Sequence, residues 1–251
     1  MFDLTWQQWA LGIVGAFLMG MAKGGLPGVG NISPLLFASA FAARESVGLL
    51  LPVLVAGDIC GVILYRRHTE WKYVWRLLPW MLLGVVLGWM MFDYLSDRAV
   101  KIFIAVTIFG MTLFQIVRWW LQRKGRDPLE KVPNSRWFSA TLGTSGGIAT
   151  MIANAAGPIG QIYFLSVDLP KMAFIGTAAW TFFIVNLSKV PLQVELGIIT
   201  LDSIGLSLVF CIFCVVGALL APLIVKRIKQ ETFQRLIWLF VIVAALKLLW
   251  D

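Results

Sequence analysis

The sequence predicts an all-α integral membrane protein built from two inverted-topology repeats of five helical elements each. Hydrophobic residues make up 59% of the 251 positions and charged residues only 14%, a balance that does not keep the surface of a soluble domain in water. The charges are also clustered, and the runs between them approach or exceed the length of about 20 residues that a spanning helix needs. The uncharged runs cover residues 4–22, 24–43, 102–117, 137–167 and 203–225.

Apolar runs and the Gly, Pro and charged residues between them divide the chain into ten helical elements. These cover about residues 6–22, 32–43, 46–66, 74–93, 99–120, 137–153, 155–167, 171–189, 203–225 and 231–250. The second and the seventh contain only about a dozen residues, which at about 1.5 Å per residue reach half-way through the hydrocarbon layer. Each follows a Gly-rich segment, which predicts a break of the helix inside the membrane.

A polar stretch separates the ten elements into two halves. We expect a first transmembrane repeat over residues 1–121, a cytoplasmic linker over 122–136 and a second transmembrane repeat over 137–251. Each half contains a Gly-Gly pair, then an Asn, then a Pro three or four residues later. These residues are Gly24, Gly25, Asn31 and Pro34 in the first half, and Gly146, Gly147, Asn154 and Pro158 in the second. Gly84 and Gly217 also stand in similar apolar sequences.

The distribution of Lys and Arg predicts how the halves are oriented. If the N-terminus lies outside and each element crosses or returns, the outside segments hold only Arg44, Arg98, Lys101, Lys189 and Lys247. Cytoplasmic loops carry the excess of Lys and Arg in membrane proteins. The pattern therefore predicts a multi-pass protein of the bacterial inner membrane with a cytoplasmic linker, both termini outside and two inverted halves, an architecture of many secondary transporters.

The two Gly-rich segments predict a binding site for a small anion. Non-helical backbone at membrane depth is tolerated where it lines a watery cavity, and the N-terminus of a half-helix presents free N–H groups and partial positive charge. Asn31, Ser33 and Asn154 add side-chain donors or caps. The alternative is that the glycines permit close helix packing and the prolines only start short helices. The candidates are Gly24, Gly25, Asn31, Ser33, Pro34, Ser145, Gly146, Gly147, Asn154, Gly157 and Pro158.

Three charged residues are candidates for coupling and steering. Asp58 lies far from either end of a predicted span, and ionisable groups at such depth are usually functional. We expect it to take up a proton, or else to be paired with a basic side chain. Asn186 occupies a similar position in the second half. Lys23 at the first break and Lys189 at the predicted end of the eighth element attract an anion or extend to the membrane surface.

The eighth element also has a polar face at helical spacing. Thr177 and Thr181 are expected to line a pathway, although the same hydroxyls can bond between helices. Trp180 is interpreted as a packing residue. Gln161 and Tyr163, in the seventh element, are weaker candidates.

The motifs around the two Gly-Gly pairs resemble the TauE/SafE sulfite-exporter family. The first is Lys-Gly-Gly-x-Pro-Gly-x-Gly from Lys23, and the second is Ser-Gly-Gly-x-x-Thr from Ser145. The similarity in size, duplication and linker covers nearly the whole chain. It implies proton-driven export of sulfite or small organosulfonates, with the site residues in the two Gly-rich segments. Ser145 stands where a second lysine would match Lys23, so no symmetric lysine pair exists.

Other function classes find little support in the sequence. An H-E-x-x-H motif and a P-loop are absent, and His68 is the only histidine. We therefore expect no enzyme, no metal and no cofactor. The basic residues lie between apolar runs, which argues against nucleic acid. The expected partners are a small anion, protons and membrane lipid, with a homodimer left open. The alternatives are a transporter or channel for another small anion and a non-transporting membrane subunit.

Overall fold

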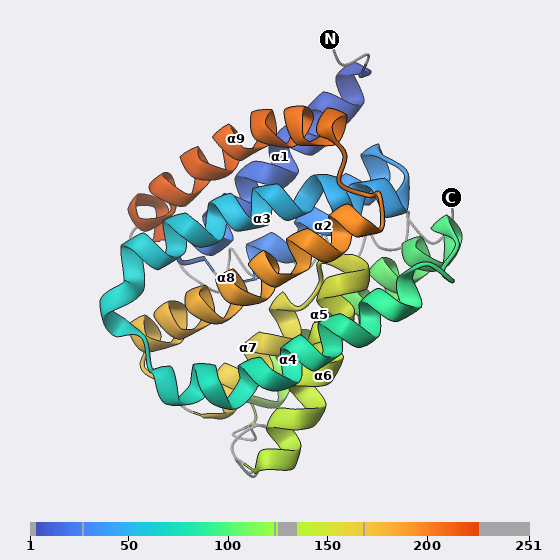
Figure 1. Cartoon of the computed structure of the whole chain (residues 1–251). Coiled ribbons are helices and arrows are strands. Elements are labelled where there is room, and N and C mark those ends of the chain that lie inside the picture. The colour runs from blue at the N-terminus through green and yellow to red at the C-terminus, as the bar shows by residue number, and fades with distance from the viewer. Residues whose placement is uncertain (1–3, 27, 123, 125–134, 168, 226–251) are drawn as a thin grey trace.

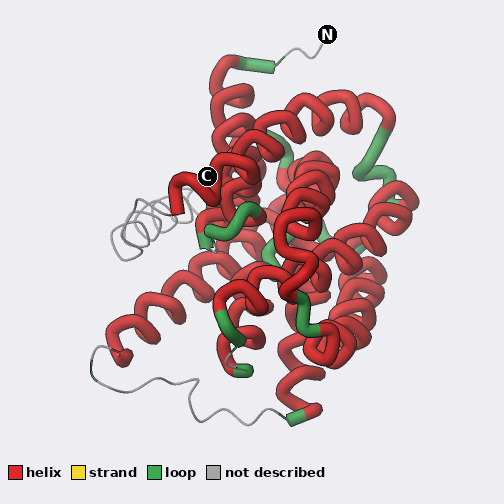
Figure 2. The backbone as a smooth tube through the Cα atoms, turned by 90° about the vertical axis from the view of Figure 1, so that its left-hand side faces the viewer, coloured by secondary structure: helices red, strands yellow, loops and turns green. Residues whose placement is uncertain are grey.

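The chain folds into helices that lie side by side. The computed structural model describes all residues except 1–3, 27, 123, 125–134, 168 and 226–251, and the described residues contain no strand (Figure 2). The α-helices are α1 (Trp6–Lys23), α2 (Ser33–Ala40), α3 (Ala43–Tyr65), α4 (Trp71–Phe92), α5 (Asp97–Gln122), α6 (Arg136–Ala153), α7 (Gly157–Ser166), α8 (Lys171–Glu195) and α9 (Leu201–Val225). The short 3₁₀ helices are η1 (Val29–Ile32) and η2 (Arg66–His68). The predicted all-α class is confirmed, whereas the predicted helix at 231–250 and most of the linker lie outside the described residues.

The longer helices have the properties of membrane spans. Within the described residues, five helical segments are long and apolar enough to cross a membrane. These segments are Ala43–His68, Trp71–Phe92, Asp97–Arg118, Lys171–Glu195 and Leu201–Leu223. Their outer faces expose large apolar side chains, among them Leu83 and Met90 on α4 and Leu208 and Leu219 on α9. Apolar faces of this extent suit contact with lipid, so the chain is a multi-pass integral membrane protein.

The helices are arranged around a central pair, α3 and α8 (Figure 1). α9 and α1 cover one side of this pair, and α4 and α6 cover the other. α1 packs against α9 in the same way that α6 packs against α4, so each outer pair joins a helix of one half to a helix of the other. α1 runs downward in Figure 1 and α6 runs upward, the directions expected of inverted halves. The division into two inverted repeats and their orientation in a membrane stay predictions.

Glycine allows close contact in both outer pairs. A methyl group on Gly84 of α4 or on Gly147 of α6 would overlap the backbone of the facing helix. Gly20 of α1 and Gly217 of α9 have the same relation in the other pair. Small residues at such crossings let two backbones approach and gain van der Waals contact where lipid offers no hydrophobic drive. The similar sequences around Gly84 and Gly217 therefore correspond to similar packing positions.

Ser145, Gly146 and Gly147 were counted with the second Gly-rich break, and this assignment is wrong, whereas the helix expected over about residues 137–153 is present. α6 continues through these residues to Ala153. Gly147 serves the close contact with α4, which is the packing alternative for a glycine pair. Ser145 is exposed, and its hydroxyl donates to the Thr141 carbonyl one turn earlier at 2.7 Å.

The glycine contacts predict a large difference between two substitutions. Gly84→Val places a branched side chain against the α6 backbone, and overpacking of this kind costs about 1–3 kcal/mol or more. Gly110→Ala is the control, because open space surrounds Gly110 on α5 and alanine favours helix. Thermal unfolding in detergent should show a lower Tm for Gly84→Val and an unchanged or higher Tm for Gly110→Ala. Equal Tm values would contradict the close contact.

Candidate functional site

The first helix break follows Lys23, the last residue of α1. Gly25 and Gly28 have φ angles of 116° and 99°, a region that side chains other than glycine disfavour. The Tyr65 hydroxyl, from the end of α3, donates to the Gly24 carbonyl at 2.7 Å. Tyr65 thus satisfies one backbone acceptor that the broken helix leaves without a partner.

The second break begins at Asn154, directly after α6. Asn154 adopts a left-handed conformation with φ 53° and ψ 27°, in which Asn is among the more tolerated residues. Its side-chain Nδ2 donates to the Val47 carbonyl of α3 at 2.9 Å. α7 then starts at Gly157, with Pro158 among its first residues and no side-chain cap. An uncapped N-terminus of this kind leaves N–H groups for an anion.

The two breaks meet at one cavity of about 110 Å³. Asn31 lines it from the first break, and Asn154 and Gly157 line it from the second. A Cβ on Gly157 would lie only 3.1 Å from the Asn31 Oδ1, so the two segments are in close contact. One water takes about 30 Å³ in the liquid, and the cavity therefore has room for a small solute.

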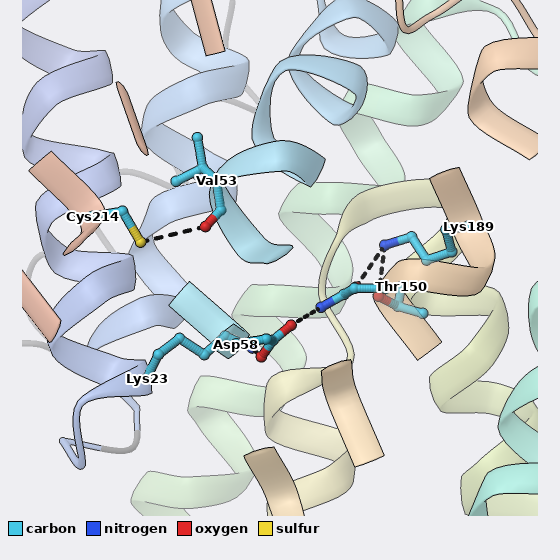
Figure 3. Close-up of polar contacts among 7 residues, drawn as sticks. Lys23, Val53, Asp58, Thr150, Lys189 and Cys214 are labelled. Carbon is cyan, nitrogen blue, oxygen red and sulfur yellow. Dashed lines mark hydrogen bonds and ion pairs between the residues drawn. The ribbon is translucent and has the colours of Figure 1, made fainter. Parts of the chain in front are cut away.

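A charged pair lies at this cavity. The Lys23 Nζ donates to the Asp58 Oδ1 at 2.5 Å, and the Asn186 Nδ2 donates to the Asp58 Oδ2 at 2.7 Å (Figure 3). Asp58 is fully buried, whereas 15% of the Lys23 side chain is exposed. The contacts join α1 and α3 of the first half to α8 of the second. Asn186, which the repeat comparison placed opposite Asp58, is its direct partner.

A second ammonium group is buried behind the cavity wall. The Lys189 Nζ donates to the Asn154 Oδ1 at 2.6 Å, the Thr150 Oγ1 at 3.1 Å and the Asn186 Oδ1 at 3.2 Å. Each acceptor is uncharged, and within the described residues Lys189 forms no ion pair. The prediction that Lys189 ends its helix is wrong, because α8 continues to Glu195 and leaves Lys189 fully buried in its interior.

The cavity wall also carries donors with spare capacity. The side chains of Asn31 and Gln161 line the cavity and make no hydrogen bond to any described residue. The Lys23 ammonium has three N–H groups and uses one of them for Asp58. It lies 5.0 Å from the centre of the Phe182 ring, which favours a cation. The arrangement can bind a small anion by an ammonium and two carboxamides.

The predicted site residues divide into two groups. The cavity is lined by Lys23, Asn31, Pro34, Asn154 and Gly157. Of the other predicted site residues, none whose side chain the structure describes lines this cavity. η1 runs directly into α2, so the Ser33 N–H donates to the Gly30 carbonyl, and its hydroxyl donates to the Gly15 carbonyl at 2.7 Å. The expected free N-terminus of α2 is therefore absent.

Two threonines that were expected to line a pathway stabilise backbone instead. The Thr177 Oγ1 accepts the Glu70 N–H at 3.0 Å, and the Thr181 Oγ1 donates to the Thr177 carbonyl at 2.8 Å. Thr150, the last residue of the Ser-Gly-Gly-x-x-Thr motif, lines the cavity but was not among the predicted site residues. Its position four residues before Asn154, on the same helix face, was the available signal. Within the described chain, no three His, Cys, Asp or Glu side chains converge as metal ligands.

Nearly the whole chain matches a known protein family. The sequence profile described as sulfite exporter TauE/SafE matches residues 9–248. The chain belongs to the sulfite exporter TauE/SafE family. The match covers both breaks and therefore every residue of the TauE/SafE cavity described above. No curated protein and no solved structure matches the chain.

The buried pair of this TauE/SafE protein predicts non-additive effects on stability. Lys23→Met or Asp58→Leu alone leaves one buried charge without its partner, which costs on the order of 3 kcal/mol. The double variant removes both charges. Unfolding of the four proteins in detergent should show that the double variant loses less stability than the sum of the single variants. An additive result would contradict a direct interaction.

Proposed function

We propose that the chain is a secondary transporter that exports a small anion, sulfite or a small organosulfonate, across the bacterial inner membrane in a proton-coupled process. One observation carries the proposal. Both helix breaks meet at a cavity lined by the Lys23 ammonium, and both its carboxylate partner Asp58 and a second ammonium, Lys189, are buried beside the wall. Membership of a sulfite exporter family supports the substrate class.

The charges around the cavity favour one bound anion. With Asp58 ionised and both lysines protonated, these three groups carry a net charge of one positive unit. Electrostatic attraction is much stronger at a buried site than in water. A singly charged oxyanion such as bisulfite or a sulfonate balances the excess charge, while Asn31 and Gln161 supply hydrogen bonds to its oxygens.

Asp58 provides a physical route to proton coupling. When Asp58 takes up a proton, it loses its charge and Lys23 loses its partner. The freed ammonium then attracts an anion more strongly. Proton and anion therefore favour each other's binding and move in the same direction, so a high concentration of the anion in the cytoplasm expels it together with a proton.

The position of the cavity supports entry from the cytoplasm. Its wall follows α7 through Gly157, Gln161 and Phe164 and includes Phe174 in the first turn of α8. These residues lead toward the connection between α7 and α8, which the charge pattern assigns to the cytoplasmic side. A cavity that extends to this side suits a carrier that loads its substrate inside the cell.

Flux into liposomes tests the function directly. Purified protein should move sulfite and small sulfonates with saturable kinetics, and an imposed pH gradient should accelerate the movement. Ohmic currents would instead favour a channel. Absence of both flux and binding for every anion tested would favour a non-transporting subunit.

Asn31→Ala should weaken substrate binding. It removes donors that line the cavity and have no other described partner, and a hydrogen bond to a charged group contributes about 1.5–3 kcal/mol. KM for sulfite flux should therefore rise about tenfold or more. Gln7→Ala, at an exposed amide on α1, is the matched control and should keep the wild-type KM. The site is wrong if both variants behave alike.

Asp58→Asn should uncouple transport from the proton gradient. The amide keeps hydrogen-bonding capacity but cannot exchange a proton. We expect anion exchange to continue while the acceleration by a pH gradient is lost. Glu45→Gln is the control, because Glu45 lies exposed at the start of the same helix. Full proton-driven transport by Asp58→Asn would remove Asp58 from the mechanism.

A further inference from the structure

A polar stripe continues along α8 beyond the cavity. Asn186, Lys189 and Gln193 are separated by three and four residues, the spacing of one helix face. Their exposed fractions are 2%, 0% and 0%. The cavity wall includes Asn186 but neither Lys189 nor Gln193. Two strongly polar side chains therefore lie buried deeper than the cavity reaches, on the side of the cavity away from the cytoplasmic connection.

Gln193 is the unexplained member of this stripe. Neither its Nε2 nor its Oε1 has a hydrogen-bond partner among the described residues. Burial of a carboxamide without a partner is unfavourable, and each such group in a native structure calls for a reason. Leucine has nearly the same size and would avoid this loss. The amide is thus poorly explained by the packing around it.

Lys189, one turn before Gln193, is likewise buried without a charged partner. Its ammonium has three neutral acceptors and no described carboxylate partner. A buried charge of this kind is stabilised by an opposite charge. Residues four apart are about 6 Å apart along a helix axis, so one small oxyanion is within reach of both the Lys189 ammonium and the Gln193 amide.

We propose that Lys189 and Gln193 form a second, outer subsite for the transported anion, occupied after the substrate leaves the cavity. The inference rests on the proposed transport function. The subsite takes a small singly charged oxyanion, to which Lys189 contributes charge and Gln193 contributes N–H donors. The stripe then supplies polar contacts in sequence, from Asn186 at the cavity to Gln193 near the end of α8.

Asn154 separates the cavity from this outer subsite. Its Oδ1 accepts from Lys189 and its Nδ2 donates to the Val47 carbonyl of α3. In this conformation one N–H of the Lys189 ammonium donates to Asn154, and an anion at the outer subsite needs that same donor. Movement of the second break relative to both α3 and α8 releases the two contacts and frees a Lys189 N–H for the anion.

Gln193→Leu tests the subsite with readouts that separate function from folding. Reconstituted protein of known orientation should transport sulfite at least tenfold more slowly, with KM raised about tenfold at the periplasmic face. Sulfite binding from the cytoplasmic face should match the wild type, because the cavity is unchanged. The Tm should stay the same or rise, since an unpaired buried amide is removed. Val194→Leu, at the half-exposed neighbouring position, is the control and should transport normally.

The opposite results would overturn the subsite. Wild-type flux and equal KM at both faces would show that Gln193 does not contact the anion. A clearly lower Tm, or failure of both Gln193→Leu and Gln193→Met to fold, would show that the amide stabilises the resting structure. Gln193→Glu adds a carboxylate one turn from Lys189 and should block transport by forming an internal ion pair. The wild-type flux itself reports separately on the proposed function.

Discussion

One chain of buried polar contacts connects both halves of this protein. It begins at Lys23 on α1, passes through Asp58 on α3 and Asn186 and Lys189 on α8, and ends at Asn154 after α6. Charges at membrane depth are unfavourable unless they are paired or face a watery space. The contacts therefore constrain where four helices lie, and any motion of one half against the other has to exchange partners within this chain.

The backbone at the two helix breaks is subject to the same constraint, because its polar groups also lie at membrane depth. Each break leaves N–H and C=O groups that lipid cannot satisfy. Tyr65 accounts for the Gly24 carbonyl, and Asn154 uses its own side chain to hold the backbone of α3. The start of α7 keeps free N–H groups beside the cavity. The same two helix breaks therefore supply N–H groups that can bind an anion and contain backbone groups that need partners inside the membrane.

The length and composition of the apolar runs correctly predicted an all-α membrane protein. The prediction failed where the same residue type can serve two structural roles. Asp58 stood out because a carboxylate in the middle of an apolar run is rare. The Gly-Gly pair after Lys23 lies at a helix break, whereas the pair that includes Gly147 lies inside a helix and allows close contact with α4. The sequence does not distinguish the two cases, because the difference depends on the facing α4 backbone. Lys189 was placed at a helix end because an unpaired lysine inside a span is unusual. Two of its three neutral partners, Thr150 and Asn154, are distant in sequence, and only Asn186 lies within one turn of the same helix.

The exchange of helices between the halves has a consequence for synthesis. α1 finds its packing partner α9 only after nearly the whole chain has entered the membrane, and α4 likewise waits for α6. Before α9 is synthesised, three intramembrane charges, Lys23, Asp58 and Lys189, have entered the membrane without all of their final neighbours. Lys23 and Asp58 belong to the same half and neutralise each other early. Lys189 similarly finds Thr150 and Asn154 within its own half. Each nascent half can therefore reside in lipid with its polar groups occupied until the other arrives.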